Sequence, residues 1–306
     1  MSVFWGTKSE ATPMAVGETD LAAESYAADT STGGVYEKKH VEDGIEVEEI
    51  RIRTEEAAER LGKPIGRYVT LTHPPAWTLW GAERERVVRV LGRALRRLSD
   101  PLCGKRERTA RTLLFVGVGN RSLTADAIGP RAADKVTATL HIRESDPDLF
   151  SRMECAGIAV LAPGVTAETG MEAAYAIRAA TEQVRPDLVI IADALAARST
   201  ARLATTIQLC DTGISPGSGI GRRHPALTRE TLGAPVIALG VPTVVSSRTL
   251  VRDALETAGY PEAFGVVEGR MGQSDFFVSP KDIDAVAEAE ADILSAAVNH
   301  CFGIVF

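Results

Sequence analysis

Two aspartates stand where the sequence is best placed to do chemistry. Asp126 lies in GVGNRSLTADAIGP at 117–130, which continues an apolar run beginning at residue 112, and Asp193 directly follows the apolar run LVIIA. Continuous apolar runs of this kind are typical of strands that are buried on both faces of a parallel sheet. Functional groups in such sheets collect at the carboxyl ends of the strands. The two aspartates are therefore expected at the same edge of the sheet, where they could face each other across a cleft.

A close pair of aspartates is a device for hydrolysis. Two neighbouring carboxylates cannot both ionise cheaply, so the pKa of one rises and the pair shares a proton. One member can then deprotonate a water molecule while the other protonates the carbonyl oxygen or the leaving amine. Plainer interpretations stay open: Asp126 as the N-cap of a helix, and Asp193 as a buried carboxylate satisfied by Arg198 or by main-chain N–H groups.

The other motifs do not match known cofactor, metal or nucleophile patterns. GVGN at 117–120 has Ser122 where a dinucleotide-binding fingerprint needs its third glycine, so a tight turn explains it better. The glycine-rich segment DTGISPGSGIGRR at 211–223 lacks the GK[ST] ending of a phosphate-binding loop, and we expect a surface loop near the cleft or an oligomer contact. The five histidines are scattered, and neither HExxH nor GxSxG occurs. We therefore expect no metal and no cofactor.

The elements that position these residues alternate between strand and helix from residue 111 onward. This order predicts an α/β fold with a three-layer, largely parallel sheet flanked by helices. The final helix is expected to have Ser279 as N-cap and Pro280 at its first position. Expected strands are 112–118, 157–163, 188–193 and 235–241, with 204–209 nearer an edge, and expected helices are 126–140, 168–184, 243–259 and 280–299.

Roughly the first eighty residues follow a different pattern from the rest, and a helix follows them. Residues 1–35 are rich in Ser, Thr, Ala and Gly, and we expect them to be weakly ordered or loosely docked. An extended segment is predicted around Asp43-Gly44, and a short helix at 54–61 that Gly62 stops. Residues 82–98 form an amphipathic helix whose arginines lie largely on a solvated face.

Composition and charge narrow the function classes. The chain has 306 residues, and its 41 acidic against 34 basic residues give a net charge of −7. An acidic surface disfavours the phosphate backbone of nucleic acid but not a basic protein partner. The four cysteines form no CxxC pair, which indicates buried, reduced thiols. No apolar run is long enough to span a bilayer and no secretory signal is present, so a cytoplasmic protein without a membrane partner is expected.

Several long motifs together resemble the germination protease family of endospore-forming bacteria. They stand in the family's order and cover residues 19 to 290 approximately. The motifs are TDLAAE, GVGNRSLTADAIGP, APGVTAETGMEA, DLVIIADALAAR, TTIQLCDTGISPGSGIGRR, ETLGAPVIALGVPTVV and FFVSPKDID.

The resemblance implies an atypical aspartic-type endopeptidase that degrades small acid-soluble, DNA-binding spore proteins during germination. Its two catalytic aspartates correspond to Asp126 and Asp193, and Asn120, Thr124 and Arg198 are expected to line the site. The family is made as a zymogen, processes itself and works as a homotetramer in the spore core. Its fold is similar to that of the hydrogenase maturation endopeptidases.

The family's substrates are cut after an acidic residue, before an apolar residue followed by Ala, with Glu shortly after. This chain carries that pattern in Asp20, Leu21, Ala22, Ala23 and Glu24. We therefore predict self-cleavage between Asp20 and Leu21. The plainer interpretation is a helix start capped by Thr19. The predicted organisation is a propeptide at 1–20 and a single α/β peptidase domain at 21–306, with an N-terminal extension and helix at 21–110 and a core at 111–306.

Two other functions stay open. One is a nickel-dependent peptidase of the hydrogenase maturation type, for which His224 is the candidate ligand, and the other is a non-catalytic spore protein that binds DNA or coat. Three features depart from the family pattern: Ala125 stands where Pro is usual, Ala192 where Ile is common, and the segment 71–81 with its HPPAW is unfamiliar.

Overall fold

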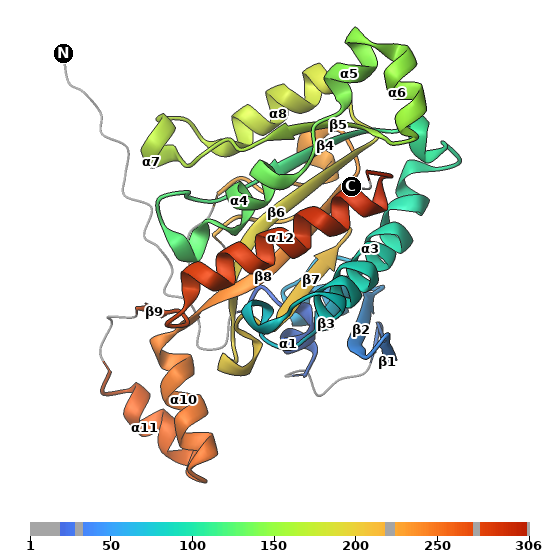
Figure 1. Ribbon diagram of the computed structural model, residues 1–306. Helices are drawn as coiled ribbons and strands as arrows, with labels where there is room; N and C mark the ends of the chain where they lie inside the picture. Colours follow the sequence, from blue (N-terminus) through green and yellow to red (C-terminus); the bar gives the residue numbers. More distant parts are fainter. Residues whose placement is uncertain (1–18, 28–32, 218–223, 272–275, 305–306) are drawn as a thin grey trace, which may run out of the picture.

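A single mixed sheet organises the computed structural model (Figure 1). The structure describes residues 19–27, 33–217, 224–271 and 276–304. The strands lie in the order β1-β2-β3-β7-β8-β6-β4-β5, and β9 pairs with β8. The strands are β1 (Val35–Glu42), β2 (Ile45–Ile52), β3 (Gly66–Thr72), β4 (Thr112–Gly117), β5 (Gly157–Leu161), β6 (Leu188–Ala197), β7 (Thr206–Cys210), β8 (Val236–Ser246) and β9 (Phe277–Val278).

Half of this sheet is parallel, as the alternating pattern predicts. Strands β5, β4, β6 and β8 run parallel to one another. The apolar runs of β4, β6 and β8 are buried almost throughout, because helices cover both faces, whereas β5 at the edge is half-buried from Ala159 onward. The predicted three-layer α/β class is therefore confirmed.

The other half of the sheet is antiparallel. Strand β7 pairs with β8 on one side and with β3 on the other, so the prediction that 204–209 lies near an edge is wrong. The polar residues Thr206 and Gln208 alternate with Ile207 and Leu209, which suggests a solvated face. In the structure these polar side chains are buried.

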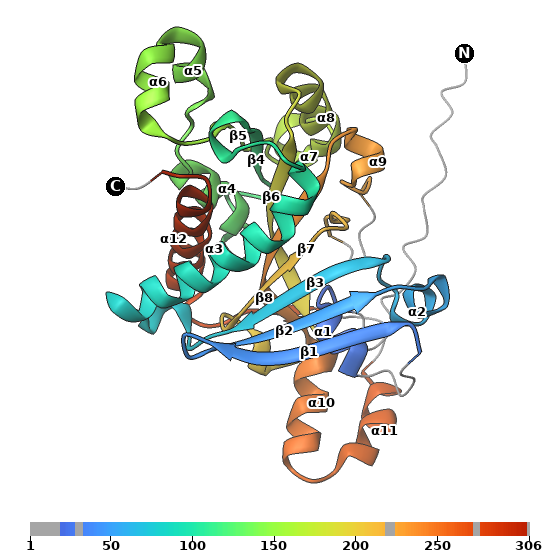
Figure 2. The ribbon, with the colours of Figure 1, turned by 90° about the vertical axis from the view of Figure 1, so that its right-hand side faces the viewer.

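Helices cover the two faces of the sheet unequally, as Figure 2 shows. Helices α3, α4 and α12 pack on one face around the largest apolar cluster. Helices α1, α2, α8 and α9 lie on the other face. The helices are α1 (Ala22–Ala27), α2 (Glu55–Leu61), α3 (Ala82–Cys103), α4 (Ile128–Lys135), α5 (Leu140–Ser145), α6 (Pro147–Met153), α7 (Thr166–Thr169), α8 (Ala173–Val184), α9 (Arg229–Leu232), α10 (Ser247–Thr257), α11 (Phe264–Glu268) and α12 (Ile283–Cys301).

Several boundaries differ from the predicted ones. Strands β6 and β8 continue beyond Asp193 and Val241 because they pair with each other up to Ala197 and Val245. Helix α10 consequently begins at Ser247 rather than at 243.

Helix α12 has Asp282 as its N-cap residue, and the prediction of Ser279 and Pro280 is wrong. The residue before Ser279, Val278, belongs to β9, so the chain needs the next residues to turn from strand to helix. Helix α2 is confirmed: Thr54 caps it, and Gly62 ends it with a φ of 62°.

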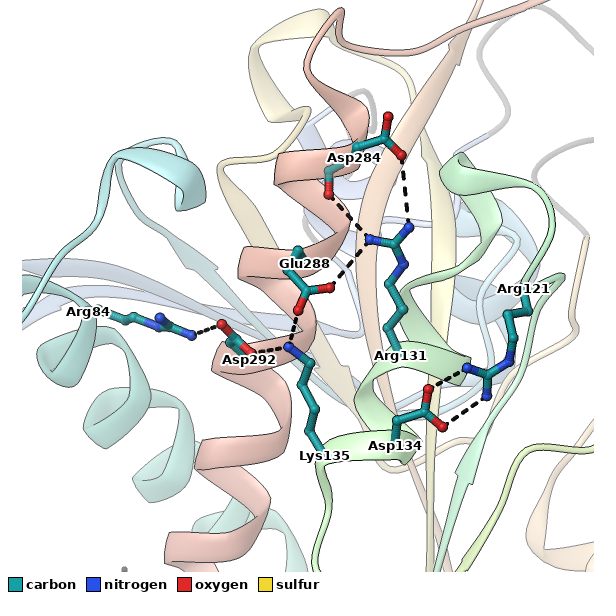
Figure 3. Close-up of polar contacts among 8 residues, drawn as sticks. All are labelled: Arg84, Arg121, Arg131, Asp134, Lys135, Asp284, Glu288 and Asp292. Atoms are coloured by element: carbon teal, nitrogen blue, oxygen red, sulfur yellow. Dashed lines mark hydrogen bonds and ion pairs between the residues drawn. The ribbon is translucent and has the colours of Figure 1, made fainter.

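Ion pairs tie α4 to α12 and α12 to α3 (Figure 3). Lys135 of α4 binds Glu288 and Asp292 of α12, and Asp292 also binds Arg84 of α3. Arg131 adds a contact from α4 to Glu288. Helix α4 begins directly after its N-cap residue Ala127, so this network joins the helix that follows Asp126 to α12.

All four cysteines are free, and three of them are buried, as their apolar surroundings predict. Within the described parts of the chain, the helices lack the length and hydropathy that crossing a bilayer requires.

Candidate functional site

Asp193 lies in the middle of β6, one residue past the end of β4. The last residue of β4, Gly117, pairs with Ala192, so Asp193 emerges where its neighbouring strand stops. Its side chain is buried, and its Oδ1 accepts a hydrogen bond from the main-chain N–H of Ala194 at 2.9 Å. Burial raises the pKa of Asp193 well above its ordinary value, and the charges of Asp126 and Asp20 raise it further.

Asp126 sits in the short 3-10 helix Thr124–Asp126 that follows β4. Its Oδ2 accepts a hydrogen bond from the N–H of Asn120 at 2.8 Å, which folds the loop back on itself. Gly119 makes this turn feasible: its φ is 127°, and an added Cβ would lie 2.1 Å from the Asp126 carbonyl oxygen. The N-cap of α4 is Ala127, which forms no side-chain cap, so the helix-cap interpretation of Asp126 is wrong.

The two aspartates come close because α4 begins directly against the sheet. An added Cβ on Gly129 would lie 2.1 Å from the carbonyl oxygen of Val118 and 2.4 Å from that of Ala192. Only glycine permits this approach of helix backbone to strand backbone. The partly exposed Asp126 is thereby held near enough for its charge to act on the buried Asp193.

The N-terminal segment from Thr19 to Ala27 is firmly packed, so the expectation of loose docking is wrong for these residues. Residues 1–18 and 28–32 lie outside the described part of the chain. Leu21 is fully buried against Leu195, Ala197 and Val245. The physical reason is that one face of β6, β8 and β7 is apolar here and this segment covers it.

Asp20 pairs with β6 like a short additional strand. Its N–H donates to the Ala196 carbonyl oxygen at 3.1 Å, and its Oδ2 accepts from the Ala196 N–H at 2.9 Å. Helix α1 begins two residues later, and Thr19 Oγ1 accepts from the N–H of Leu21 at 3.0 Å. The Asp20–Leu21 bond therefore directly precedes a helix, and the charge of Asp20 is near enough to raise the pKa of Asp193.

Glu24 is buried at the other end of the segment. Its carboxylate accepts from the N–H groups of Arg198 and Ser199 at 2.7 and 3.0 Å. Arg198 thus contributes to the site through its main chain, and the N–H of Ala194, rather than an arginine, bonds Asp193. Asn120 contacts Asp126, as expected of a site-lining residue, and Thr124 opens the 3-10 helix that carries Asp126.

Sequence reasoning missed Gln208. Its side chain is buried on β7 and hydrogen-bonds to Asp20 and Ala22. The alternation of Thr206 and Gln208 in TTIQLC is the signal that could have found it, had this strand been placed inside the sheet.

The proposed nickel ligand His224 pairs with Glu172, with 3.0 Å between Nδ1 and Oε2. Among the residues the structure describes, no three His, Cys, Asp or Glu side chains form a group able to hold a metal ion. The expected loop at 211–223 is described only up to residue 217.

Comparison with known proteins identifies relatives of this chain. The germination protease family model matches residues 9–258. The chain is 38% identical to the germination protease of Clostridium perfringens over 92% of this chain and 93% of that protein. It is 34% identical to that of Caldanaerobacter subterraneus over 92% of both, and 37% identical to that of Bacillus subtilis over 80% of this chain and 66% of that protein.

Among solved structures, a [NiFe] hydrogenase maturation protease, HycI from Thermococcus kodakarensis, matches 62% of this chain and 93% of its own, with 16% identity and a TM-score of 0.33. The family model and the length and identity of the sequence matches are decisive: the chain belongs to the germination protease family.

Proposed function

We propose that this peptidase initiates the degradation of small acid-soluble, DNA-binding spore proteins during germination, using Asp126, Asp193 and a water molecule. One observation carries the proposal. The chain's own segment Asp20–Glu24, which has the acidic–apolar–Ala–Ala–Glu pattern of a substrate, is hydrogen-bonded to β6 at Ala196, and the charge of Asp20 is near enough to raise the pKa of Asp193. A peptide of the right sequence thus docks on the strand that carries the buried carboxyl group.

The environments of the two aspartates suggest different roles. Asp193 is buried and its pKa is raised well above the ordinary value, which suits it to the role of acid. Asp126 is partly exposed and accepts a hydrogen bond from a main-chain N–H, and we assign it the role of base.

In this mechanism Asp126 takes a proton from water, and the hydroxide oxygen bonds to the carbonyl carbon of the scissile peptide. Asp193 gives its proton to the carbonyl oxygen. Collapse of the tetrahedral intermediate breaks the C–N bond, and the amine leaves with the proton that Asp126 received. Asp193 takes back one hydroxyl proton as the new carboxyl group forms, so both aspartates return to their starting states. The reaction uses only protons already present on the pair and on water, so we propose no metal and no cofactor.

The same geometry supports a self-processing zymogen. We expect cleavage between Asp20 and Leu21, because Asp20 is hydrogen-bonded to β6 three residues beyond Asp193. In this proposal the bond reaches the two aspartates because the segment is bound to β6, and the segment does not need to be flexible. Loss of residues 1–20 would then expose a new N-terminus at Leu21.

The proposed setting is the spore core, with the enzyme cytoplasmic and homotetrameric. The net charge of −7 suits basic protein substrates better than nucleic acid. Small acid-soluble spore proteins are the proposed partners, with no direct role for DNA or a membrane.

The deciding experiment is incubation of the purified full chain with a small acid-soluble spore protein. Mass spectrometry should find cuts after an acidic residue, and N-terminal sequencing of the processed enzyme should begin at Leu21. Binding of the spore protein without any cut would support a non-catalytic role instead. Loss of cleavage with a chelator, restored by nickel, would support a maturation-type metallopeptidase.

A further inference from the structure

We propose that Gln208 positions the scissile carbonyl group, and that Gln208 with residues 194–199 forms the substrate-binding site, here called the peptide site. In this structure the chain's own residues 19–24 occupy it. The inference rests on the proposed peptidase function and adds which residues recognise the substrate and in what order.

Gln208 binds the main chain on both sides of Leu21. Its Nε2 donates to the carbonyl oxygen of Asp20 at 3.0 Å, and its Oε1 accepts from the N–H of Ala22 at 2.7 Å. The Asp20 carbonyl belongs to the bond predicted to be cut. One planar amide therefore fixes this bond in place, as a neighbouring strand would.

The donor on the carbonyl oxygen has a catalytic consequence. When water adds to the carbonyl carbon, negative charge develops on that oxygen, and a hydrogen bond aimed at it becomes stronger. Gln208 is buried, so water competes little for this bond. The side chain thus stabilises the transition state more than the bound peptide.

The register of the sheet places Gln208 opposite Asp193. Both residues pair with Gly240 of β8, one from β6 and one from β7. Partners in register point to the same face, and strands are about 4.8 Å apart, so their Cα atoms are about 10 Å apart. Gly240 has no side chain of its own here, and the side chain of Leu195 packs over it, because an added Cβ on Gly240 would lie 2.3 Å from Leu195 Cδ1. The segment spans this interval, bonded to β6 at Asp20 and to Gln208 at Ala22.

The peptide site offers a different environment to each substrate position. The acidic residue before the bond meets the N–H of Ala196, and the apolar residue after it fits among Leu195, Ala197 and Val245.

The next two positions, occupied by Ala22 and Ala23, are almost fully buried and admit only small side chains. The Glu four residues after the acidic residue meets the N–H groups of Arg198 and Ser199. The peptide site thus supplies, in order, a partner for each position of the segment that Asp20 to Glu24 form.

The test separates docking of the segment from cleavage of the bond. Gln208→Glu keeps the acceptor for Ala22 and replaces the amide donor to Asp20 by a carboxyl group, which cannot donate when ionised. Gln208→Met loses both the donor and the acceptor. Thr206→Val is the matched control, because Thr206 is buried on the same face of β7 and its hydroxyl has no hydrogen-bond partner within the described residues.

Self-cleavage is followed with the full chain by mass spectrometry. We expect Gln208→Glu to slow it about 100-fold, the typical effect of losing one donor to a developing oxyanion. Thr206→Val should stay within twofold of the wild type. Hydrogen exchange of residues 19–27, measured in the Asp193→Asn background, should be unchanged by Gln208→Glu and at least tenfold faster in Gln208→Met.

The outcomes are decisive. A wild-type chain that cleaves while Gln208→Glu cleaves equally fast overturns the role of Gln208 and leaves the proposed function intact. Equal slowing by Thr206→Val, or unchanged exchange in Gln208→Met, overturns it as well, because the effect is then one of general stability. A wild-type chain with no peptidase activity overturns both proposals.

Discussion

Asp193 and Glu290 are buried carboxyl groups on opposite faces of the sheet. Burial disfavours the ionised form of both, but their surroundings differ. Burial raises the pKa of each well above its ordinary value. For Glu290 burial is the whole cause, whereas Asp193 also feels the charges of Asp126 and Asp20. A raised pKa therefore does not by itself mark a catalytic group.

Glu290 lies on α12 against His73, which belongs to the segment HPPAW. The distance from Oε1 to Nε2 is 3.6 Å, and both side chains are inaccessible to solvent. Burial lowers the pKa of His73, and its Nδ1 lies 2.7 Å from the Pro74 carbonyl oxygen. A neutral imidazole beside a protonated carboxyl group is the arrangement that burial favours. This pair joins two layers of the fold and faces no peptide.

Replacing each carboxyl group by its amide should separate the catalytic aspartates from Glu290 by the largest difference in activity. Asp193→Asn and Asp126→Asn should each lower the rate of spore-protein hydrolysis by about 1,000-fold or more, because a proton donor or acceptor is lost. Glu290→Gln should leave the rate within threefold. Cleavage assays on variants with unchanged circular dichroism check this, and near-normal turnover in a folded Asp193→Asn chain would remove that residue from the mechanism.

Titration of Asp193 tests whether neighbouring charges, which do not act on Glu290, raise its pKa. Asp126→Asn should lower the pKa of Asp193, and Asp20→Asn should lower it less, because the charge of Asp126 is the larger of the two effects. In both variants the pKa should stay above the ordinary value, since burial is the leading cause. Carboxyl-carbon NMR measures it directly. An Asp193 that titrates identically in Asp126→Asn would show that the two groups do not interact.

Replacing Glu290 should change the stability of the fold and not the rate of catalysis. Its folded pKa is raised, so its contribution to stability is full below its unfolded pKa of about 4.5 and is lost as the pH rises through the folded pKa. The Gln side chain of Glu290→Gln cannot ionise. At pH 9 the free energy of unfolding of this variant should therefore exceed that of the wild type by at least about 1 kcal/mol, and at pH 5 this gain should be absent.

Urea unfolding of the wild type and Glu290→Gln at pH 5 and pH 9 measures this effect, and taking the difference between the two chains removes the contribution of His73, which both of them carry. Equal pH dependence of the wild type and Glu290→Gln would contradict the assignment.

The sequence predicted one of these two buried sites and not the other, for a physical reason. Asp193 follows an apolar strand, and a charged group ending such a run stands out. Glu290 lies within an amphipathic helix rich in acidic residues, where a buried position looks the same as an exposed one. Its burial depends on His73, more than two hundred residues away, and on the packing of α12 against the sheet.

The same limit applies to the peptide site. The cleavage pattern in TDLAAE was readable, but its docking depends on β7 lying inside the sheet. That position is fixed by β3, a strand the sequence analysis did not predict. Long-range pairing, rather than local propensity, decided this half of the fold.

We expect the smallest effect at the exposed ion pairs between α4 and α12. Unlike Asp193 and Glu290, these charged groups stay in contact with water. Lys135→Met removes the contacts to Glu288 and Asp292, whose side chains are 54% and 30% exposed. Exposed pairs contribute about 0.5 kcal/mol, so unfolding should be easier by no more than about 1 kcal/mol, and 1 M salt should abolish the difference.

Self-cleavage of Lys135→Met should stay within twofold of the wild type, because the glycine contacts of Gly129 with the sheet, not the ion pairs, hold Asp126 beside Asp193. The matched control is Arg121→Met, which removes a similarly exposed pair with Asp134. A tenfold loss of cleavage in Lys135→Met alone would mean that charge contacts on α12 do position the catalytic loop. The two faces of the sheet would then be coupled rather than independent.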